Sequence, residues 1–382
     1  MIILKLTMDN ILSFNDFSIN FTYPRKIKSL INSEHLETIP SFRYKKVNIF
    51  VGSNATGKTS LCTVIWKIIA FLNFKEKNLI DKLVTDAKKD GHIEVDFVDN
   101  KEVDYAFYRM KIQICAIDEN DNASVRISNV KIVLKNGDTY ESICKSIDRI
   151  EAPYLDYLEV LKSLNIKTGF NVILQDNDTI FNKVDFIKSD DKDDIRKYEK
   201  ILNSVFKTLD PSIESIKQSQ ESDDAYVIKH QNGKTIIIQN GCSLFDIPYL
   251  SSGTKYGFNI ANMLYSIGKH DYGTYVIDEQ FSYVNSDIEV AVLSTMISLL
   301  GATEQLFFTT HNSNILSMGL PFHSFYFMKK KLIGDKLIIM VTCGSEKENR
   351  NNVSPKNLYD NDAFATAPIL DLILDLGGEN AT

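Results

Sequence analysis

A glycine-rich stretch near the N-terminus has the residue types and spacing that bind phosphate, because it fits the pattern G-x-x-x-x-G-K-[ST]. Glycines let such a loop turn its backbone N–H groups towards phosphate, at the N-terminus of a helix whose dipole also favours anions. The lysine would contact the β- and γ-phosphates, and the threonine hydroxyl would join a Mg²⁺ shell. The pattern therefore predicts ATP or another nucleoside triphosphate bound by Gly52, Ser53, Asn54, Ala55, Thr56, Gly57, Lys58, Thr59 and Ser60.

The segments on both sides of this loop have the periodicity that the mechanism requires. Val47, Ile49, Phe50 and Val51 predict a buried strand, and from Leu61 to Ile69 the apolar residues recur at helical spacing. A glycine turn that matched the pattern by chance would not need a strand before it and a helix after it. We therefore interpret residues 47–69 as a strand, a phosphate-binding loop and a helix.

Two acidic residues, Asp278 and Glu279, end an apolar strand predicted over residues 274–279. Behind a phosphate-binding loop, such an aspartate completes a magnesium shell, and the neighbouring glutamate can polarise the attacking water. Two acids at a strand end more often belong to a capped loop. The upstream loop favours the catalytic interpretation here.

Two weaker motifs accompany this pair. Residues 250–257 resemble a helix start with Ser251 or Ser252 as N-cap, and a helix N-terminus with a serine hydroxyl is also suited to bind a γ-phosphate presented by a second subunit. His311 follows a strand predicted over residues 305–309 and could sense the γ-phosphate or position water. A lone histidine is usually structural, so this assignment depends on order and spacing.

The remaining periodicity predicts the elements that position these residues. Alternating apolar residues predict paired strands in residues 2–22 and an antiparallel meander further along; Asn232-Gly233 predicts a hairpin turn. In the last third, helices alternate with buried strands, which implies a parallel sheet. Outside that third, the predicted meander strands cover 92–98, 105–117 and 125–134, the helices 154–164 and 195–209, and a short strand 169–174.

Composition limits the class of protein. The chain has 382 residues with 44% hydrophobic content, as expected for one large globular domain or two lobes, and its net charge of −7 argues against non-specific nucleic-acid binding by the whole surface. The five cysteines are far apart and predict buried, reduced residues rather than disulfides or a zinc site. The N-terminus turns polar too soon for a signal peptide and no segment is apolar enough to cross a membrane, so we expect a cytoplasmic protein.

The order of these motifs resembles the heads of ABC-type ATPases. The phosphate loop, Leu250-Ser-Ser-Gly-Thr-Lys255, the strand with Asp-Glu and Thr309-Thr-His-Asn312 follow one another as in that family. The similarity is greatest to the RecF/SMC branch and the OLD-like bacterial ATPases, because L-x-L-x-x-x-N-x-x-S-F from Leu4 to Phe14 and the segment from Asn357 to Pro368 also match. The expected fold is therefore α/β, a P-loop NTPase of the ABC-type head class, with an antiparallel β lobe and a helical lobe that bears the signature.

The resemblance also implies roles for single residues and a head-to-tail dimer that encloses two ATPs. It assigns Lys58 and Thr59 to the phosphate loop, Asp278 and Glu279 to the Walker B pair, His311 to the switch histidine, and Gln175 to the magnesium-binding Q-loop; the signature would be Ser251, Ser252, Gly253, Thr254 and Lys255. Ser252 and Thr254 depart from the family pattern, and residues 280–285 lack the usual aspartate. These departures put communication between the two sites in question.

The expected division places the phosphate loop and β lobe in residues 1–150, a helical insertion in 151–222, and the signature, Walker B pair and switch histidine in 223–382. Only 71 residues follow His311, since 382 − 311 = 71, which is too few for the TOPRIM nuclease of OLD proteins. We therefore expect the regulatory or sensor ATPase of a bacterial anti-phage system, a homodimer or higher oligomer that controls a separate effector, with the apolar segment 367–376 as one docking candidate. A RecF-like DNA-repair clamp is the alternative, so nucleic acid stays open as a partner, and a transporter subunit is the least favoured.

Overall fold

The computed structural model describes residues 1–23, 34–99, 104–116, 123–164, 166, 168–174, 186–242, 250–281, 284–334, 336–348 and 353–366. Its centre is a six-stranded sheet with the order β15-β14-β3-β13-β12-β8, in which β14, β3, β13, β12 and β8 run parallel and β15 runs antiparallel at one edge. The strands are β3 (Val47–Val51), β8 (Phe170–Ile173), β12 (Thr274–Asp278), β13 (Gln305–Thr310), β14 (Phe325–Ile333) and β15 (Lys336–Cys343).

Alternate residues of these central strands face two different hydrophobic cores, because successive side chains of a strand point to opposite faces. Phe50, Val276 and Phe307 face the core that contains α1 (Lys58–Phe74). Their neighbours Ile49 and Ile277 face the core of the helical layer, with α6 (Gly257–Lys269) and α7 (Ser286–Leu299). Both faces of the sheet are therefore buried, as is usual for parallel strands.

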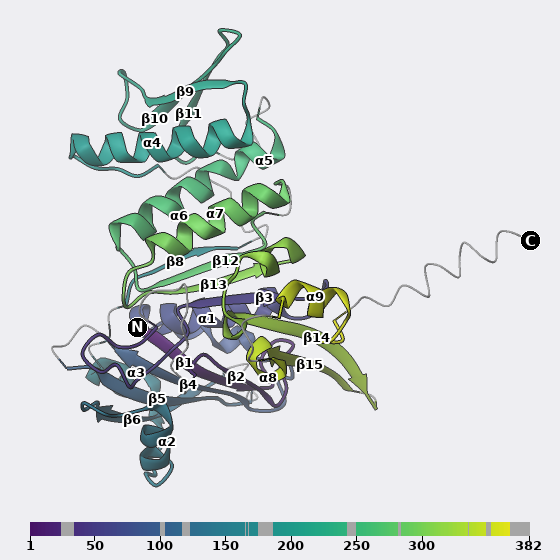
Figure 1. Cartoon of the computed structure of the whole chain (residues 1–382). Coiled ribbons are helices and arrows are strands. Elements are labelled where there is room, and N and C mark those ends of the chain that lie inside the picture. The colour runs from purple at the N-terminus through teal and green to yellow at the C-terminus, as the bar shows by residue number, and fades with distance from the viewer. Residues whose placement is uncertain are drawn as a thin grey trace, which may run out of the picture.

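A second six-stranded sheet, entirely antiparallel, covers the other side of α1 (Figure 1). Because α1 lies between two sheets, apolar residues surround it on most sides. The outer face of this sheet carries a smaller core, built with residues 34–44 and α2 (Tyr140–Ile147). The strand order is β2 (Phe17–Asn20), β1 (Ile2–Asp9), β4 (Gly91–Asp99), β5 (Ala106–Ile114), β6 (Val125–Val133) and β7 (Leu155–Asp156).

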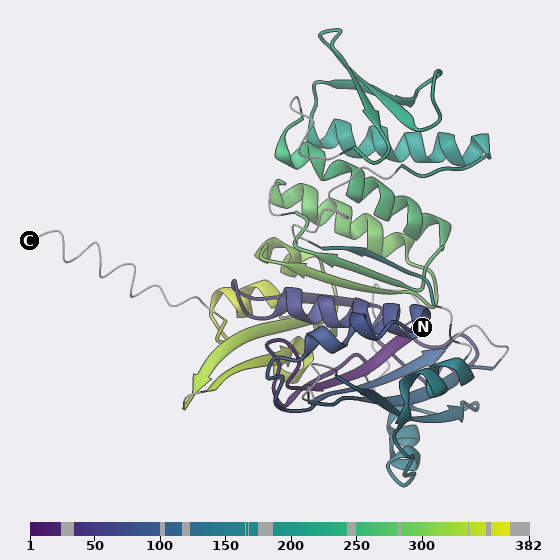
Figure 2. The same cartoon turned by 180° about the vertical axis from the view of Figure 1, so that it is seen from behind.

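The helical lobe lies at the other end of the molecule, above α6 and α7 in Figures 1 and 2. Here α4 (Lys192–Leu209) packs on α6 and supports a three-stranded sheet of β9 (Ile213–Gln218), β10 (Ala225–His230) and β11 (Thr235–Gln239). The expected division at residue 222 lies between β9 and β10, which pair in one sheet. The shorter elements are α3 (Tyr157–Ser163), α5 (Ser252–Lys255), α8 (Gly344–Lys347), α9 (Pro355–Asp360) and the 3₁₀ turns Lys77–Leu79, Asp81–Leu83, Ser313–Ser317 and Phe322–Ser324.

The structure agrees with most expected elements, including the meander, the Asn232-Gly233 hairpin and the strand that precedes the phosphate loop. The helix 58–74, the parallel pairing of β12 with β13, and β8 also lie where the periodicity predicts them. The sequence did not indicate α2, β9 or the β14–β15 hairpin. Only Cys62 and Cys343 are buried, whereas the other three free cysteines are partly exposed. Among the described residues, no helix is long and apolar enough to cross a membrane.

Candidate functional site

Three adjacent parallel strands bring the predicted site residues together. The phosphate loop follows β3, the acidic pair lies at the end of β12, and His311 follows β13, which runs between them (Figure 1). Because the carboxyl ends of parallel strands meet at one edge of a sheet, residues as far apart in sequence as Lys58 and His311 share one site. The phosphate loop, the acidic pair and the histidine therefore converge, although they come from three separate segments of the sequence.

The loop itself has the strained backbone that its glycines predict. Gly57 has φ +94°, and a Cβ on Gly52 would lie 2.4 Å from the carbonyl oxygen of Met328. The Thr56 hydroxyl donates to the Ser53 carbonyl at 2.9 Å and closes the turn. No side chain caps the start of α1 and its first turn carries no acid, so no side-chain acceptor of that turn competes with a phosphate for these backbone N–H groups.

Lys58 closes this loop from inside. Its ammonium donates to the carbonyls of Gly52 at 2.9 Å and Ser53 at 3.0 Å, and lies 3.2 Å from Glu279 Oε1. Burial lowers the pKa of Lys58, and the charge of Glu279 offsets only part of that effect. The lysine is thus a buried cation whose partners an incoming phosphate can replace.

Glu279 connects the lysine to the histidine. Its Oε1 lies 2.7 Å from His311 Nε2, and its backbone N–H donates to the Thr309 hydroxyl at 3.0 Å. Burial alone would raise the pKa of Glu279, but the hydrogen bond from His311 and the charge of Lys58 hold it below the usual value. Its φ of 48° is left-handed, a strained conformation for a residue with a side chain. Backbone strain of this kind is common at active and ligand-binding sites, where it fixes the orientation of a side chain.

Asp278 has the properties of a magnesium ligand. It is fully buried; Oδ1 accepts a hydrogen bond from Thr309 at 2.6 Å, whereas Oδ2 has no hydrogen-bond partner among the described residues. Burial raises the pKa of Asp278, and the neighbouring hydroxyls of Thr309 and Thr59 offset this only in part. A buried carboxylate oxygen without a partner, close to the threonine that the loop pattern assigns to the metal, fits an oxygen-coordinated Mg²⁺.

The sequence analysis assigned no role to Thr309, although its hydroxyl donates to the Asp278 carboxylate and accepts from the Glu279 backbone N–H. Its place could have been found from strand register, because Thr309 pairs directly with Asp278 across β13 and β12. The signal is a pair of threonines, Thr309 and Thr310, at the end of a buried strand. The Thr309 hydroxyl holds the Asp278 side chain and the backbone of Glu279 in place at the end of β12.

The signature segment does not join this site within one chain. Ser251 caps α5, since its Oγ accepts from the Thr254 N–H at 3.1 Å and lies 2.6 Å from the Thr254 hydroxyl. α5 belongs to the helical lobe, and the central sheet separates it from α1 (Figures 1 and 2). Thr254 is fully buried. The surroundings of Ser252 and Gly253, the whole of Gln175, positions 282–283 of the segment 280–285 and the docking candidate 367–376 lie outside the described residues.

Comparisons with known proteins establish the fold. One solved structure, the SmcHead bound to the C-winged helix domain of ScpA, has a TM-score of 0.52 and 12% identity over 91% of this chain and 100% of that one. The Smc head domain with an extended coiled coil derived from Pyrococcus furiosus, bound to the C-terminal domain of ScpA, has a TM-score of 0.53 and 12% identity over 90% and 97%. The sequence matches no protein-family model and no curated protein. The chain therefore has the fold of SMC head domains, the P-loop ABC-type ATPase fold, which confirms the expected fold class.

Proposed function

We propose that this protein binds and hydrolyses ATP in complex with Mg²⁺. The observation that carries the proposal is the convergence of Lys58, Asp278, Glu279 and His311, from three neighbouring strands, on the carboxyl edge of the central sheet. Each has the chemistry that the reaction needs: a cation for phosphate, a carboxylate for the metal, a carboxylate base and a hydrogen-bonding imidazole. The distant likeness to SMC heads supports this proposal through the fold alone.

The present contacts indicate how the site would change when it is used. Phosphate oxygens would replace the Gly52 and Ser53 carbonyls and Glu279 as partners of Lys58, which releases Glu279 to face a water molecule. Held ionised by its neighbours, Glu279 would accept a proton from that water, and His311 would keep its carboxylate in place. Bound Mg²⁺, held by Thr59 and Asp278, with Gln175 as a third candidate ligand, would neutralise phosphate charge.

We also propose that two copies enclose ATP head to tail, with Ser251 to Lys255 of one copy at the phosphates held by the other. The place of α5 across the central sheet from α1 supports this arrangement, because the segment is too far round the molecule to complete its own site. Ser251→Arg should abolish ATP-dependent dimerisation measured by light scattering, while ATP still binds to the single head. An unchanged dimer would remove the signature from the interface.

Glu279→Gln tests the catalytic proposal. The amide keeps the size of the side chain but is no base, so we expect hydrolysis to fall at least about 100-fold while ATP still binds and dimers accumulate. Glu304→Gln is the matched control, because Glu304 is also a buried acid but lies at the opposite end of β13. Normal turnover by Glu279→Gln would show that another group activates the water.

For the biological role, we propose a cytoplasmic regulatory subunit of a bacterial anti-phage system that acts on a separate effector protein. The OLD-like order of motifs supports it, as does the fact that both SMC heads compared above are bound to parts of ScpA. Tagged Glu279→Gln protein captured from its host with ATP and Mg²⁺ tests the proposal. A stoichiometric second protein would support it, whereas nucleic acid without a protein would favour the RecF-like alternative.

A further inference from the structure

Glu289 is a buried acid that the proposed reaction does not use. It lies in the first turns of α7 with 5% of its surface exposed. Burial raises its pKa, and hydrogen bonds to Thr310 and Asn312 offset only part of the effect. Burying a carboxylate costs free energy unless hydrogen bonds satisfy its oxygens, so the partners of Glu289 indicate what this acid does.

Among the described residues, both side-chain hydrogen bonds of Glu289 go to the two neighbours of His311. The Thr310 hydroxyl donates to Oε1 at 2.6 Å, and the Asn312 side-chain amide donates to Oε2 at 2.9 Å. The two carboxylate oxygens therefore hold the chain immediately before and immediately after the histidine. With both flanking residues fixed, the main chain at His311 has little freedom to move.

Further hydrogen bonds connect the segment that follows Glu279 with the segment that carries His311. α7 begins at Ser286, seven residues after Glu279, and Asn312 also donates to the Ser286 carbonyl at 3.1 Å. Asn314 extends the connection through its amide to the Ser286 hydroxyl at 3.2 Å. Several hydrogen bonds thus connect the start of α7 to the end of β13 and the segment that follows it. Glu289 supplies the charged group among them.

We propose that Glu289 is a positioning residue that holds His311 against Glu279. This inference rests on the proposed ATPase function, because it concerns the geometry of that same site. Glu289 does not touch the reacting groups; it acts through Thr310 and Asn312, and without it the loop after β13 loses the anchor that sets the 2.7 Å contact between the imidazole and the catalytic carboxylate.

Glu304 provides a matched control for the effect of removing any buried acid. It is also 5% exposed, and burial also raises its pKa. Its hydrogen bonds go to the Gly301 N–H at 2.6 Å and to His270 Nδ1 at 3.1 Å, next to the amino end of β13. A loss of folding stability should therefore be common to Glu289→Ala and Glu304→Ala, whereas a loss of turnover should be confined to the first.

The kinetic experiment compares Glu289→Ala, Glu289→Gln and Glu304→Ala at a temperature where all are folded. We expect Glu289→Ala to lower kcat for ATP about 10-fold with KM within twofold of the wild type, because misplaced groups slow the chemical step more than binding. Glu289→Gln should recover most of kcat, since its amide can accept from Asn312 and donate to the Thr310 hydroxyl. Wild-type kcat in Glu289→Ala, or an equal loss in Glu304→Ala, would overturn the proposal.

A second measurement does not depend on hydrolysis. Ring resonances of His311, assigned with His311→Gln, should shift in ATP-free Glu289→Ala and stay in place in Glu304→Ala. An unchanged His311 signal in Glu289→Ala would overturn the positioning role even if the wild type hydrolyses ATP. Conversely, a wild type without ATPase activity would refute the proposed function while the shifted signal still supported the anchor.

Discussion

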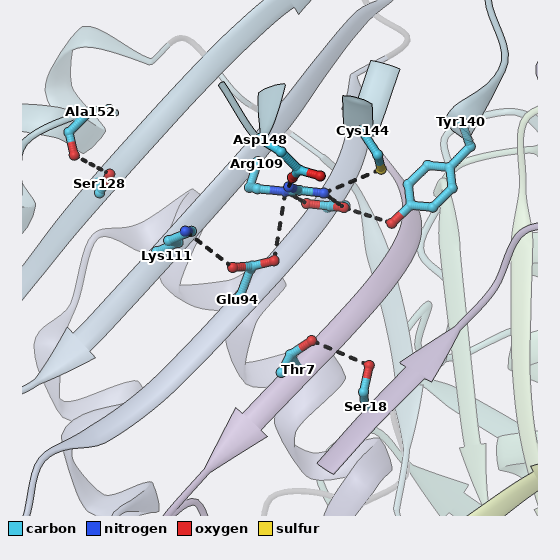
Figure 3. A network of polar contacts seen from close by, with 11 residues as sticks. Thr7, Ser18, Glu94, Arg109, Lys111, Ser128, Tyr140, Cys144, Asp148 and Ala152 are labelled. Carbon is cyan, nitrogen blue, oxygen red and sulfur yellow. Dashed lines mark hydrogen bonds and ion pairs between the residues drawn. The ribbon is translucent and has the colours of Figure 1, made fainter. Parts of the chain in front are cut away.

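Two buried clusters of charge, one in the antiparallel sheet and one at the proposed nucleotide site, differ in how they compensate for the burial of charged groups. In the sheet, Arg109 pairs with Asp96 directly across β5 and β4, and two of its nitrogens bind the two carboxylate oxygens at 2.8 Å. Figure 3 draws this carboxylate, without a label, beside Arg109. A bidentate pair of this kind is the geometry that best compensates for burying both charges.

The remaining groups of the Arg109 cluster are also satisfied. Tyr140 donates to Asp96 Oδ2 at 2.7 Å, while Arg109 reaches Asp148 at 2.6 Å and the Cys144 sulfur at 3.3 Å (Figure 3). The hydrogen bonds to Asp96 raise the pKa of Arg109 above its already high value. Because Tyr140 and Cys144 belong to α2, the cluster fastens that helix to the sheet.

The hydrogen-bonding groups of the proposed nucleotide site are not all satisfied in this way. Asp278 Oδ2 is buried without a partner among the described residues, Glu279 has left-handed backbone, and Lys58 uses carbonyls of its own loop. A satisfied cluster stabilises a fold, whereas an incompletely satisfied and strained one is characteristic of a ligand site. We therefore expect the Arg109 cluster to stabilise the fold and the second cluster to serve a ligand. The following variants test this distinction.

Arg109→Met should have the largest effect, a loss of about 3–5 kcal/mol in the free energy of unfolding, because it leaves Asp96 buried without its cation. Urea unfolding measures it. We expect ATP turnover per folded molecule to be unchanged, since the cluster belongs to the β lobe. A loss of unfolding free energy below about 1 kcal/mol would mean that the Arg109–Asp96 pair does not stabilise the fold.

Lys58→Ala should weaken ATP binding at least about 100-fold, equivalent to about 2.7 kcal/mol, because the cation that meets the phosphates is removed. Titration with a fluorescent ATP analogue measures the dissociation constant. Folding should change far less than in Arg109→Met, since His311 still binds Glu279. Tight binding by this variant would refute the phosphate-loop assignment.

Much of this site could be predicted because its signals are local. The phosphate loop is one contiguous motif, and β3 and β12 are mostly apolar strands that end at Gly52 and at the acidic pair. Once these strands are taken to be parallel, their carboxyl ends must lie at the same edge of the sheet. The strand–turn pattern at Asn232-Gly233 is equally local. Such features need no knowledge of distant partners.

The missed features depend on tertiary contacts. Glu289 binds Thr310 and Asn312 more than 20 positions away, and nothing around it distinguishes it from an exposed helical acid. The β14–β15 hairpin begins as a buried strand beside β3 and continues through three lysines to an exposed tip at Gly334 with φ +60°. This change of environment within one strand breaks the period-two pattern from which strands are predicted.

Asp278→Asn should stabilise the protein without nucleotide by about 1 kcal/mol at pH 7.5, or about 2 °C in Tm. The raised pKa means that the folded state binds this proton more tightly than the unfolded state, so the carboxyl lowers stability as pH rises above its ordinary value of 3.8. Calorimetry at several pH values should therefore show a gain that shrinks towards pH 4. A destabilised variant would place Asp278 with the structural cluster instead.

Lys111→Ala should have the smallest effect, although its ammonium faces the same Glu94 as Arg109. The Lys111–Glu94 distance is 3.6 Å, but the two side chains are 48% and 27% exposed, so water screens the charges. A double-mutant cycle with Glu94→Gln should give a coupling energy below about 0.5 kcal/mol in urea unfolding. A coupling of several kcal/mol would mean that position within the cluster, rather than desolvation, sets the strength of each pair.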